Sequence, residues 1–227
     1  MQYSKVFSLC QSLEQLQHLV LSDFKSQFDR ATQGLFSKRS ILPALRSVTL
    51  KSCYGFDDAG LKIFFGSFKK KPTSVKIQAN DQLTIFGVLT SIKAFAKNIE
   101  KLQFDDLFDS DIAALPAHLQ NYLSLFVSLK EAQLCTEAVQ GMVLPHIPVT
   151  LEYLHLCDTR KLEVGYLLLG LERWGNKRTL PKKLVLRYHT FQEAALRDIR
   201  VSLVYFSPPV ISIDRFFRLC AVRRASI

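Results

Sequence analysis

The stretch LRSVTLKSCYGFDDAGL, residues 45–61, decides how the rest of the chain is interpreted. Its apolar residues follow the spacing L-x-x-L-x-L from Leu45 to Leu50, and Cys53 lies three residues later. A polar loop follows, and a run with helical spacing begins at Leu61. This pattern predicts a short strand, a tight turn closed by a small side chain, and a helix that returns along the strand.

The same spacing recurs on both sides of this stretch. Consecutive central apolar residues, here called anchors, lie 22 to 30 residues apart and about 27 on average. Asn80 takes the turn position that Cys53 fills one unit earlier, and prolines precede most anchors by a few residues. Proline ends a helix and favours an extended chain before it, so a strand is predicted at each anchor. The anchors are Leu19, Val48, Val75, Leu102, Ala132, Leu154, Leu184 and Ile211.

Runs with helical spacing lie between the anchors, and acidic or hydroxyl residues are placed to start several of them. The predicted fold class is therefore α/β: a leucine-rich-repeat solenoid, or horseshoe, of about eight repeats of ~27 residues, with a concave parallel β-sheet and convex helices. The helical runs are 4–13, 61–68, 85–95, 119–126, 162–174, 191–203 and 214–222, and the helix starts are Asp57–Asp58, Ser110–Asp111 and Thr190.

The repeats extend over the whole chain, which predicts one domain over residues 1–227. A solenoid usually needs polar end repeats, and neither end of this sequence has an obvious one. The chain is therefore expected to be a fragment of a longer solenoid.

The repeat at residues 45–61 resembles the cysteine-containing repeat of F-box proteins with leucine-rich repeats. That unit reads L-x-x-L-x-L-x-x-C followed by I-T-D-x-G-L, and Cys53, Asp58 and Gly60 match its most distinctive positions. The other repeats match only at the strand anchors, and in this they are similar to the degenerate repeats of fungal F-box-like proteins. The resemblance implies that the repeats recognise the substrate of a ubiquitin ligase. An F-box would bind the ligase adaptor, but the sequence before Leu16 has neither the length nor the opening motif of an F-box.

Catalytic, metal and cofactor motifs are absent from the sequence. The five histidines form no H-E-x-x-H pair, the nine glycines form no phosphate-binding loop, and the five cysteines form no C-x-x-C pair. His155 and Cys157 alternate on one predicted strand, but a third group to complete a site is missing. No enzyme activity, metal or cofactor is therefore expected.

The concave face is the first candidate contact surface. Residues that alternate with the anchors should point toward a ligand there. They are mostly polar with few aromatics, which suits a protein or peptide partner; the alternative is a solvated face without a partner. The predicted partner-binding residues are Thr49, Lys51, Lys76, Gln78, Gln103, Asp105, Gln133, His155 and Arg187.

The last quarter of the chain is the second candidate surface. Residues 173–227 contain 12 Lys and Arg against 3 Asp and Glu, whereas residues 1–172 contain 18 against 17. Such a field could attract an acidic protein or nucleic acid, although a solvated face is the ordinary fate of such charge. The predicted basic patch consists of Lys177, Arg178, Lys182, Lys183, Arg187 and Tyr188.

The sequence thus predicts a non-catalytic protein-interaction scaffold, the substrate-recognition part of an F-box-like ubiquitin-ligase subunit. One alternative is a nucleic-acid-binding module that uses residues 173–227, and another is an enzyme inhibitor or GTPase regulator built on the same repeats. The longest apolar run, residues 164–171, is too short to cross a bilayer. With no secretory signal at the start, the expected location is intracellular, cytoplasmic or nuclear.

Overall fold

The computed structural model describes residues 3–24, 28, 30–37, 41–108, 122–135, 147–148, 150–156, 182–186 and 210–213. The chain divides into two compact units, Met1–Leu129 and Lys130–Ile227. Each is described by itself, and the prediction of a single domain over residues 1–227 stays a prediction.

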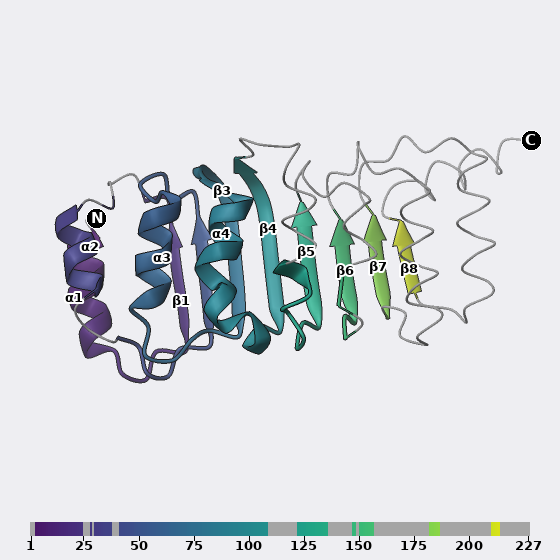
Figure 1. Cartoon of the computed structure of the whole chain (residues 1–227), viewed down its shortest axis with the longest axis horizontal. Helices are drawn as coiled ribbons and strands as arrows, with labels where there is room; N and C mark the ends of the chain where they lie inside the picture. Colours follow the sequence, from purple (N-terminus) through teal and green to yellow (C-terminus); the bar gives the residue numbers. More distant parts are fainter. Residues whose placement is uncertain are drawn as a thin grey trace, which may run out of the picture. The chain divides into compact units, whose positions relative to one another are not determined.

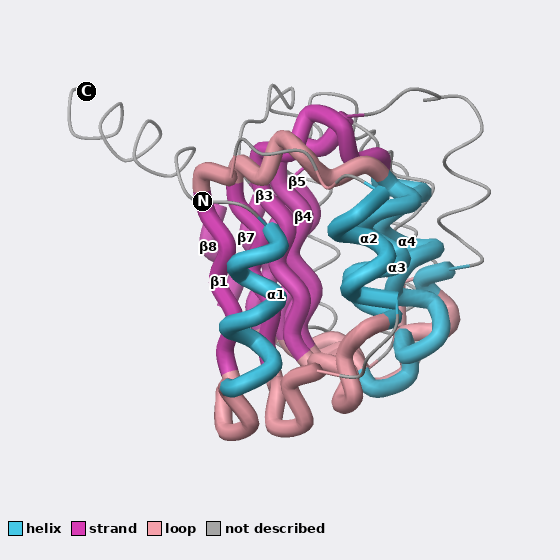
Figure 2. Tube along the Cα trace, turned by 90° about the vertical axis from the view of Figure 1, so that its left-hand side faces the viewer, coloured by secondary structure: helices cyan, strands magenta, loops and turns pink. Residues whose placement is uncertain are grey.

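The first unit is a parallel sheet with helices on one face (Figure 1). Figure 2 shows α2, α3 and α4 together on one side of the strands, while α1 lies at the β1 edge. The elements are α1 (Tyr3–Ser12), β1 (His18–Ser22), α2 (Arg30–Ser37), β2 (Ser47–Lys51), α3 (Asp58–Gly66), β3 (Ser74–Thr84), α4 (Ile85–Ile92), the 3-10 helix η1 (Lys93–Asn98) and β4 (Lys101–Phe108).

In the second unit, the described residues include four parallel strands that pair in chain order. They are β5 (Glu131–Cys135), β6 (Tyr153–Leu156), β7 (Lys183–Leu186) and β8 (Val210–Ile213). The predicted helical runs 162–174, 191–203 and 214–222, with the helix starts Ser110–Asp111 and Thr190, lie outside the described residues. The eight-repeat solenoid as a whole therefore stays a prediction.

The strand anchors predicted from the sequence pair with one another in register. In the first unit Leu19, Val48, Val75 and Leu102 lie side by side on successive strands. In the second unit the paired anchors are Ala132, Leu154, Leu184 and Ile211. The predicted strand positions and their parallel order are confirmed. Parallel neighbours require a long crossover, which the interval of about 27 residues supplies.

The helices of the first unit are built on a cluster of phenylalanine rings against the inner face of the sheet. Neighbouring rings are 4.7 to 6.5 Å apart between centroids, a spacing typical of tilted and edge-to-face packing. The predicted runs 61–68 and 85–95 are confirmed as α3 and as α4 with η1. Helix α2 was not predicted from the sequence. The phenylalanine cluster consists of Phe28, Phe36, Phe56, Phe64, Phe65 and Phe68.

The same turn follows Ser22 at the end of β1 and Lys51 at the end of β2, and it lies within β3 after Gln78. Asp23, Ser52 and Ala79 hold equivalent positions and all adopt a left-handed backbone, with φ of 56°, 53° and 48°. The Asp23 N–H donates to the carbonyl of Lys51, and the Ser52 N–H donates in the same way to that of Gln78. The backbone therefore turns at the same point in consecutive segments.

The side chains after this turn support the sequence interpretation of Cys53 and Asn80. Cys53 Sγ donates to the Leu21 carbonyl (3.3 Å), and Asn80 Nδ2 donates to the equivalent Leu50 carbonyl (3.4 Å). Asn80 Oδ1 also accepts from the Cys53 N–H at 2.7 Å. These two buried polar side chains join consecutive turns.

The caps of helices α3 and α4 are joined to each other by hydrogen bonds. Asp57 begins α3, as predicted from the sequence. Asp57 caps α3 by accepting from the Gly60 N–H at 2.6 Å. The neighbouring Asp58 carboxylate accepts from both the N–H (3.0 Å) and the hydroxyl (2.7 Å) of Thr84. Thr84 in turn accepts from the Gly87 N–H at 2.9 Å and so caps α4. Caps of this kind each stabilise a helix by about 1 kcal/mol.

Gly87→Ala should destabilise the protein by about 1–3 kcal/mol, because its added Cβ would overlap the Asp58 carboxyl group and disturb both caps. Urea unfolding followed by circular dichroism measures the change. Gly66→Ala is the matched control, since nothing lies within 4 Å of its added Cβ; it should be neutral, or stabilising by up to about 1 kcal/mol. Equal effects of the two substitutions would contradict the importance assigned to the close packing of Gly87 against the Asp58 carboxyl group.

Candidate functional site

The face of the first sheet opposite the helices is the candidate contact surface. Its side chains alternate with the buried anchors, so β1 and β2 are buried at every second position. The alternating residues of β2, β3 and β4 form rows in register: Thr49 beside Lys76 and Gln103, and Lys51 beside Gln78 and Asp105. Six of the predicted partner-binding residues are thus brought together on one face.

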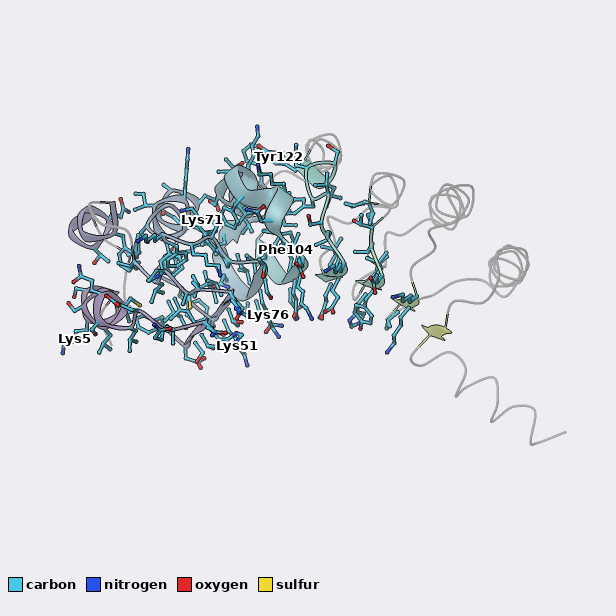
Figure 3. All side chains as sticks on the ribbon, turned by 90° about the horizontal axis from the view of Figure 1, so that it is seen from below. Lys5, Lys51, Lys71, Lys76, Phe104 and Tyr122 are labelled. Carbon is cyan, nitrogen blue, oxygen red and sulfur yellow. The ribbon has the colours of Figure 1, made fainter. Side chains whose placement is uncertain are left out.

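The face of the first sheet opposite the helices is called the outer face below. Its electrostatics are set by lysine side chains among neutral polar groups. Lys51 is exposed, and Thr49, Lys76 and Gln103 are half-buried. Gln78 Nε2 donates to Asp105 Oδ2 at 3.2 Å, which orients the carboxylate along the row. Figure 3 shows Lys51 and Lys76 pointing away from the helices, on the opposite side of the sheet from Lys71.

One further row on this face was missed from the sequence. His18, Ser47, Ser74 and Lys101 pair in register at the start of the strands. His18 Nδ1 and Ser47 Oγ share a hydrogen bond of 2.7 Å. Extending the alternation by two residues toward the start of each strand would have identified this row, because every second residue of a strand lies on the same face.

In the second unit, the predicted residues are in different environments. Gln133 is half-buried, whereas His155 beside it is only 5% exposed and its ring lies 6.4 Å from that of Tyr153. Strand alternation predicts that His155 lies on the contact face, but its side chain is buried and therefore not open to a partner there. Arg187 lies outside the described residues.

Two residues of the predicted basic patch make contacts with β6 or the residue before it. Lys182 Nζ lies 2.7 Å from Glu152 Oε2, and its hydrogen bond and charge lower the pKa of that carboxyl group. Lys183 Nζ lies 5.6 Å from the centre of the Tyr153 ring, within cation–π range. Both lysines are exposed, so these contacts link neighbouring strands weakly. The other members of the patch, Lys177, Arg178, Arg187 and Tyr188, lie outside the described residues.

Two cysteines of the first unit are poorly suited to chemistry. Cys10 and Cys53 are buried free thiols, and burial raises the pKa of each to about 11. Both are therefore protonated at neutral pH and are weak nucleophiles and weak metal ligands. Within the described ranges, no group of three or more His, Cys, Asp or Glu side chains is placed to hold a metal ion.

Comparison with known proteins gives a likeness of fold and no family. No family model matches the chain, and no curated protein matches it. Among solved structures, it is similar to a chain in the crystal structure of the Rad7 and Elc1 complex in yeast, with a TM-score of 0.51 and 15% sequence identity. The match covers 91% of this chain and 56% of that one, so the chain spans little more than half the length of its neighbour. At this identity the likeness shows the fold alone: a mixed α/β arrangement on an open parallel sheet.

The described part of the chain contains no helix that is both long enough and apolar enough to span a membrane.

Proposed function

We propose that the chain is a leucine-rich-repeat solenoid and acts as a non-catalytic protein-interaction scaffold. Its contact surface is the outer face of β1–β4, where six predicted residues lie in two rows on adjacent strands. Side chains on neighbouring strands of a well-packed sheet are held in fixed relative positions, which favours recognition of an extended surface. This juxtaposition is the observation that carries the proposal.

The ubiquitin-ligase role is the more specific part of the proposal. It is supported by the match of residues 45–61 to the cysteine-containing repeat and by the Cys53 and Asn80 side chains that close equivalent turns. The neighbour of similar fold comes from a complex of two proteins, which agrees with a role in protein association. In this role the chain would hold the substrate, and the ligase adaptor would be bound through an F-box outside this chain.

Site-specific photo-crosslinking tests the contact surface. A photoreactive phenylalanine analogue at Thr49 or Gln103 should link a discrete protein in cell lysate, in high salt and after nuclease treatment. The same analogue at Lys62, an exposed residue of α3 on the other side of the sheet, is the matched control. Linkage at Lys62 alone would contradict the assigned surface. Linkage to nucleic acid alone, in a parallel sample without nuclease, would favour the nucleic-acid-binding alternative.

A further inference from the structure

The edge of the first sheet at which the strands begin is called the amino edge below, and it is the lower edge of that sheet in Figure 1. The segments that lead into β2, β3 and β4 are joined there by hydrogen bonds. The Thr73 N–H donates to the carbonyl of Arg46 (2.9 Å), and the Glu100 N–H donates in the same way to that of Thr73 (2.8 Å). Lys70 lies three residues before Thr73, and Lys97 three residues before Glu100. The two lysines therefore hold equivalent positions in adjacent segments.

The amino edge is rich in basic residues. The segments that form it in β1–β4 contain seven Lys and Arg and two carboxylates, Glu14 and Glu100, and none of the described aspartates of the first unit lies in them. Asp105 on the outer face is four residues beyond Lys101, about 13 Å along β4. That distance exceeds the Debye length of about 8 Å at physiological salt, so Asp105 offsets this charge weakly. The segments are residues 13–18, 41–47, 67–74 and 93–101, and the basic residues are Arg46, Lys69, Lys70, Lys71, Lys93, Lys97 and Lys101.

Some of these lysines are already engaged within the chain. Lys71 Nζ donates to two carbonyls in the last turn of α3, at 2.8 and 2.9 Å. Lys93 Nζ lies 5.5 Å from the centre of the Tyr122 ring, and Lys101 has an interaction of its own. These three are therefore not counted as open to a ligand. The side chains that are exposed and have neither a hydrogen bond nor an ion pair with a described residue are Lys69, Lys70 and Lys97.

Exposed apolar side chains accompany these lysines. Val127 is 59% exposed and lies five residues before its anchor, as Lys70 and Lys97 do before theirs. Leu125 in the same segment is 37% exposed, and Leu13, before β1, is 43% exposed. Peripheral proteins bind a lipid surface by combining the burial of such apolar side chains with attraction of basic ones to anionic headgroups. The amino edge has both kinds of side chain.

We propose that the amino edge of the first unit binds an anionic lipid surface. The open lysines bind headgroup phosphates and carboxylates, while Leu125 and Val127 enter the boundary between headgroups and acyl chains. Equivalent positions of consecutive segments form a line, so a flat surface reaches the lysines of adjacent segments at once. A nucleic acid fits less well, because its phosphate backbone would leave the two apolar side chains in water. This binding goes beyond the proposed function and leaves the outer face open to a protein partner.

Co-sedimentation of the full chain with lipid vesicles tests this inference. Vesicles of phosphatidylcholine with about one third phosphatidylserine are compared with vesicles of phosphatidylcholine alone, at low and physiological salt. Duplex DNA and a polyglutamate peptide are compared with them at equal negative charge. We expect the chain to sediment with the phosphatidylserine vesicles, and less so at the higher salt. It should bind them more tightly than either soluble polyanion, since only the lipid buries the apolar side chains.

The double variant Lys70→Gln/Lys97→Gln should lower the partition coefficient onto phosphatidylserine vesicles about 30-fold, or about five-fold per lysine. Lys5→Gln/Lys62→Gln is the matched control, since it removes the same charge from exposed lysines of α1 and α3 outside the amino edge. It should change the partition coefficient less than about three-fold. Val127→Ser should lower the coefficient about five-fold, because less apolar surface is buried in the lipid.

Several results would overturn the proposal. Equal losses in the two double variants would mean that only the net charge of the chain matters. Equal binding to the two kinds of vesicle would remove the role of the anionic headgroups, and unchanged binding of Val127→Ser would remove that of the apolar side chains. Tighter binding of duplex DNA or of polyglutamate than of vesicles would assign the amino edge to a nucleic acid or to an acidic protein.

Discussion

Phe64→Ala is expected to lower the free energy of unfolding by about 4 kcal/mol, the largest effect of any substitution considered for this chain. The Phe64 side chain is fully buried, and its ring lies 4.8 Å from that of Phe68 and 5.1 Å from that of Phe56. It also contacts Phe28 and Phe36, which belong to the β1–α2 segment. Truncation would leave a cavity at the point where consecutive helices meet, and rings fixed by several neighbours can collapse into it only in part.

Urea unfolding monitored by circular dichroism measures this loss. Phe86→Ala is the matched control: the same atoms are removed, but the Phe86 side chain on α4 is 43% exposed, and its ring lies 5.9 Å from that of Tyr122. It should cost about 1 kcal/mol or less. Since domains are stable by only about 5–15 kcal/mol, the Phe64 variant should lose a large share of its margin. A difference below about 1 kcal/mol between the two variants would show that the cluster is not the packing centre of the first unit.

The strand positions could be predicted from the sequence because two independent signals coincide there. Inward residues such as Val48 and Leu50 alternate with polar ones, and the same alternation returns after a nearly constant interval. Either signal alone is common in unrelated proteins. Their combination specified the register closely enough that the predicted anchors pair directly across neighbouring strands.

Helix α2 could not be predicted in the same way because its inward side is short and partly polar. The side chains of Thr32 and Phe36 are buried one turn apart, and Phe28 precedes the helix at the same spacing. Three residues, one of them a threonine, do not distinguish a helix from a loop in sequence. The helix is defined by tertiary packing of Phe28 and Phe36 against Phe64, which is remote along the chain.

The candidate site was predicted only in outline, because the contacts of its side chains also depend on residues that are remote along the chain. Strand alternation assigns a residue to a face, but it does not reveal what else lies on that face. His155 was placed correctly in its strand, yet it is buried. Likewise Lys182 was predicted as part of a basic patch, but the ion pair of its ammonium group with Glu152, 30 residues away, could not be predicted. Such long-range partners follow from the register of the strands and not from local composition.

Asn80→Leu is expected to destabilise the protein by about 3 kcal/mol, chiefly through lost hydrogen bonds, since Leu and Asn have the same number and branching of side-chain heavy atoms. The Asn80 side chain is 1% exposed, accepts from the Cys53 N–H at 2.7 Å and donates to the Gln78 carbonyl at 2.6 Å. Leucine can form neither bond. The Cys53 N–H would become a buried donor without its side-chain partner, which costs about 1–3 kcal/mol, whereas the Gln78 carbonyl still accepts from the Ser52 N–H.

Two further substitutions make the Asn80 measurement specific. Asn98→Leu changes an exposed residue of η1 and should alter stability by less than about 0.5 kcal/mol. Asn80→Cys should be about 1 kcal/mol less destabilising than Asn80→Leu, because a thiol there can donate to the Leu50 carbonyl as Cys53 Sγ does to that of Leu21. That ranking would mean that thiol and amide side chains are interchangeable at equivalent turns, which is what a repeating unit requires. If Asn80→Cys and Asn80→Leu unfold at the same urea concentration, the two turns share a backbone geometry, but their thiol and amide side chains are not interchangeable.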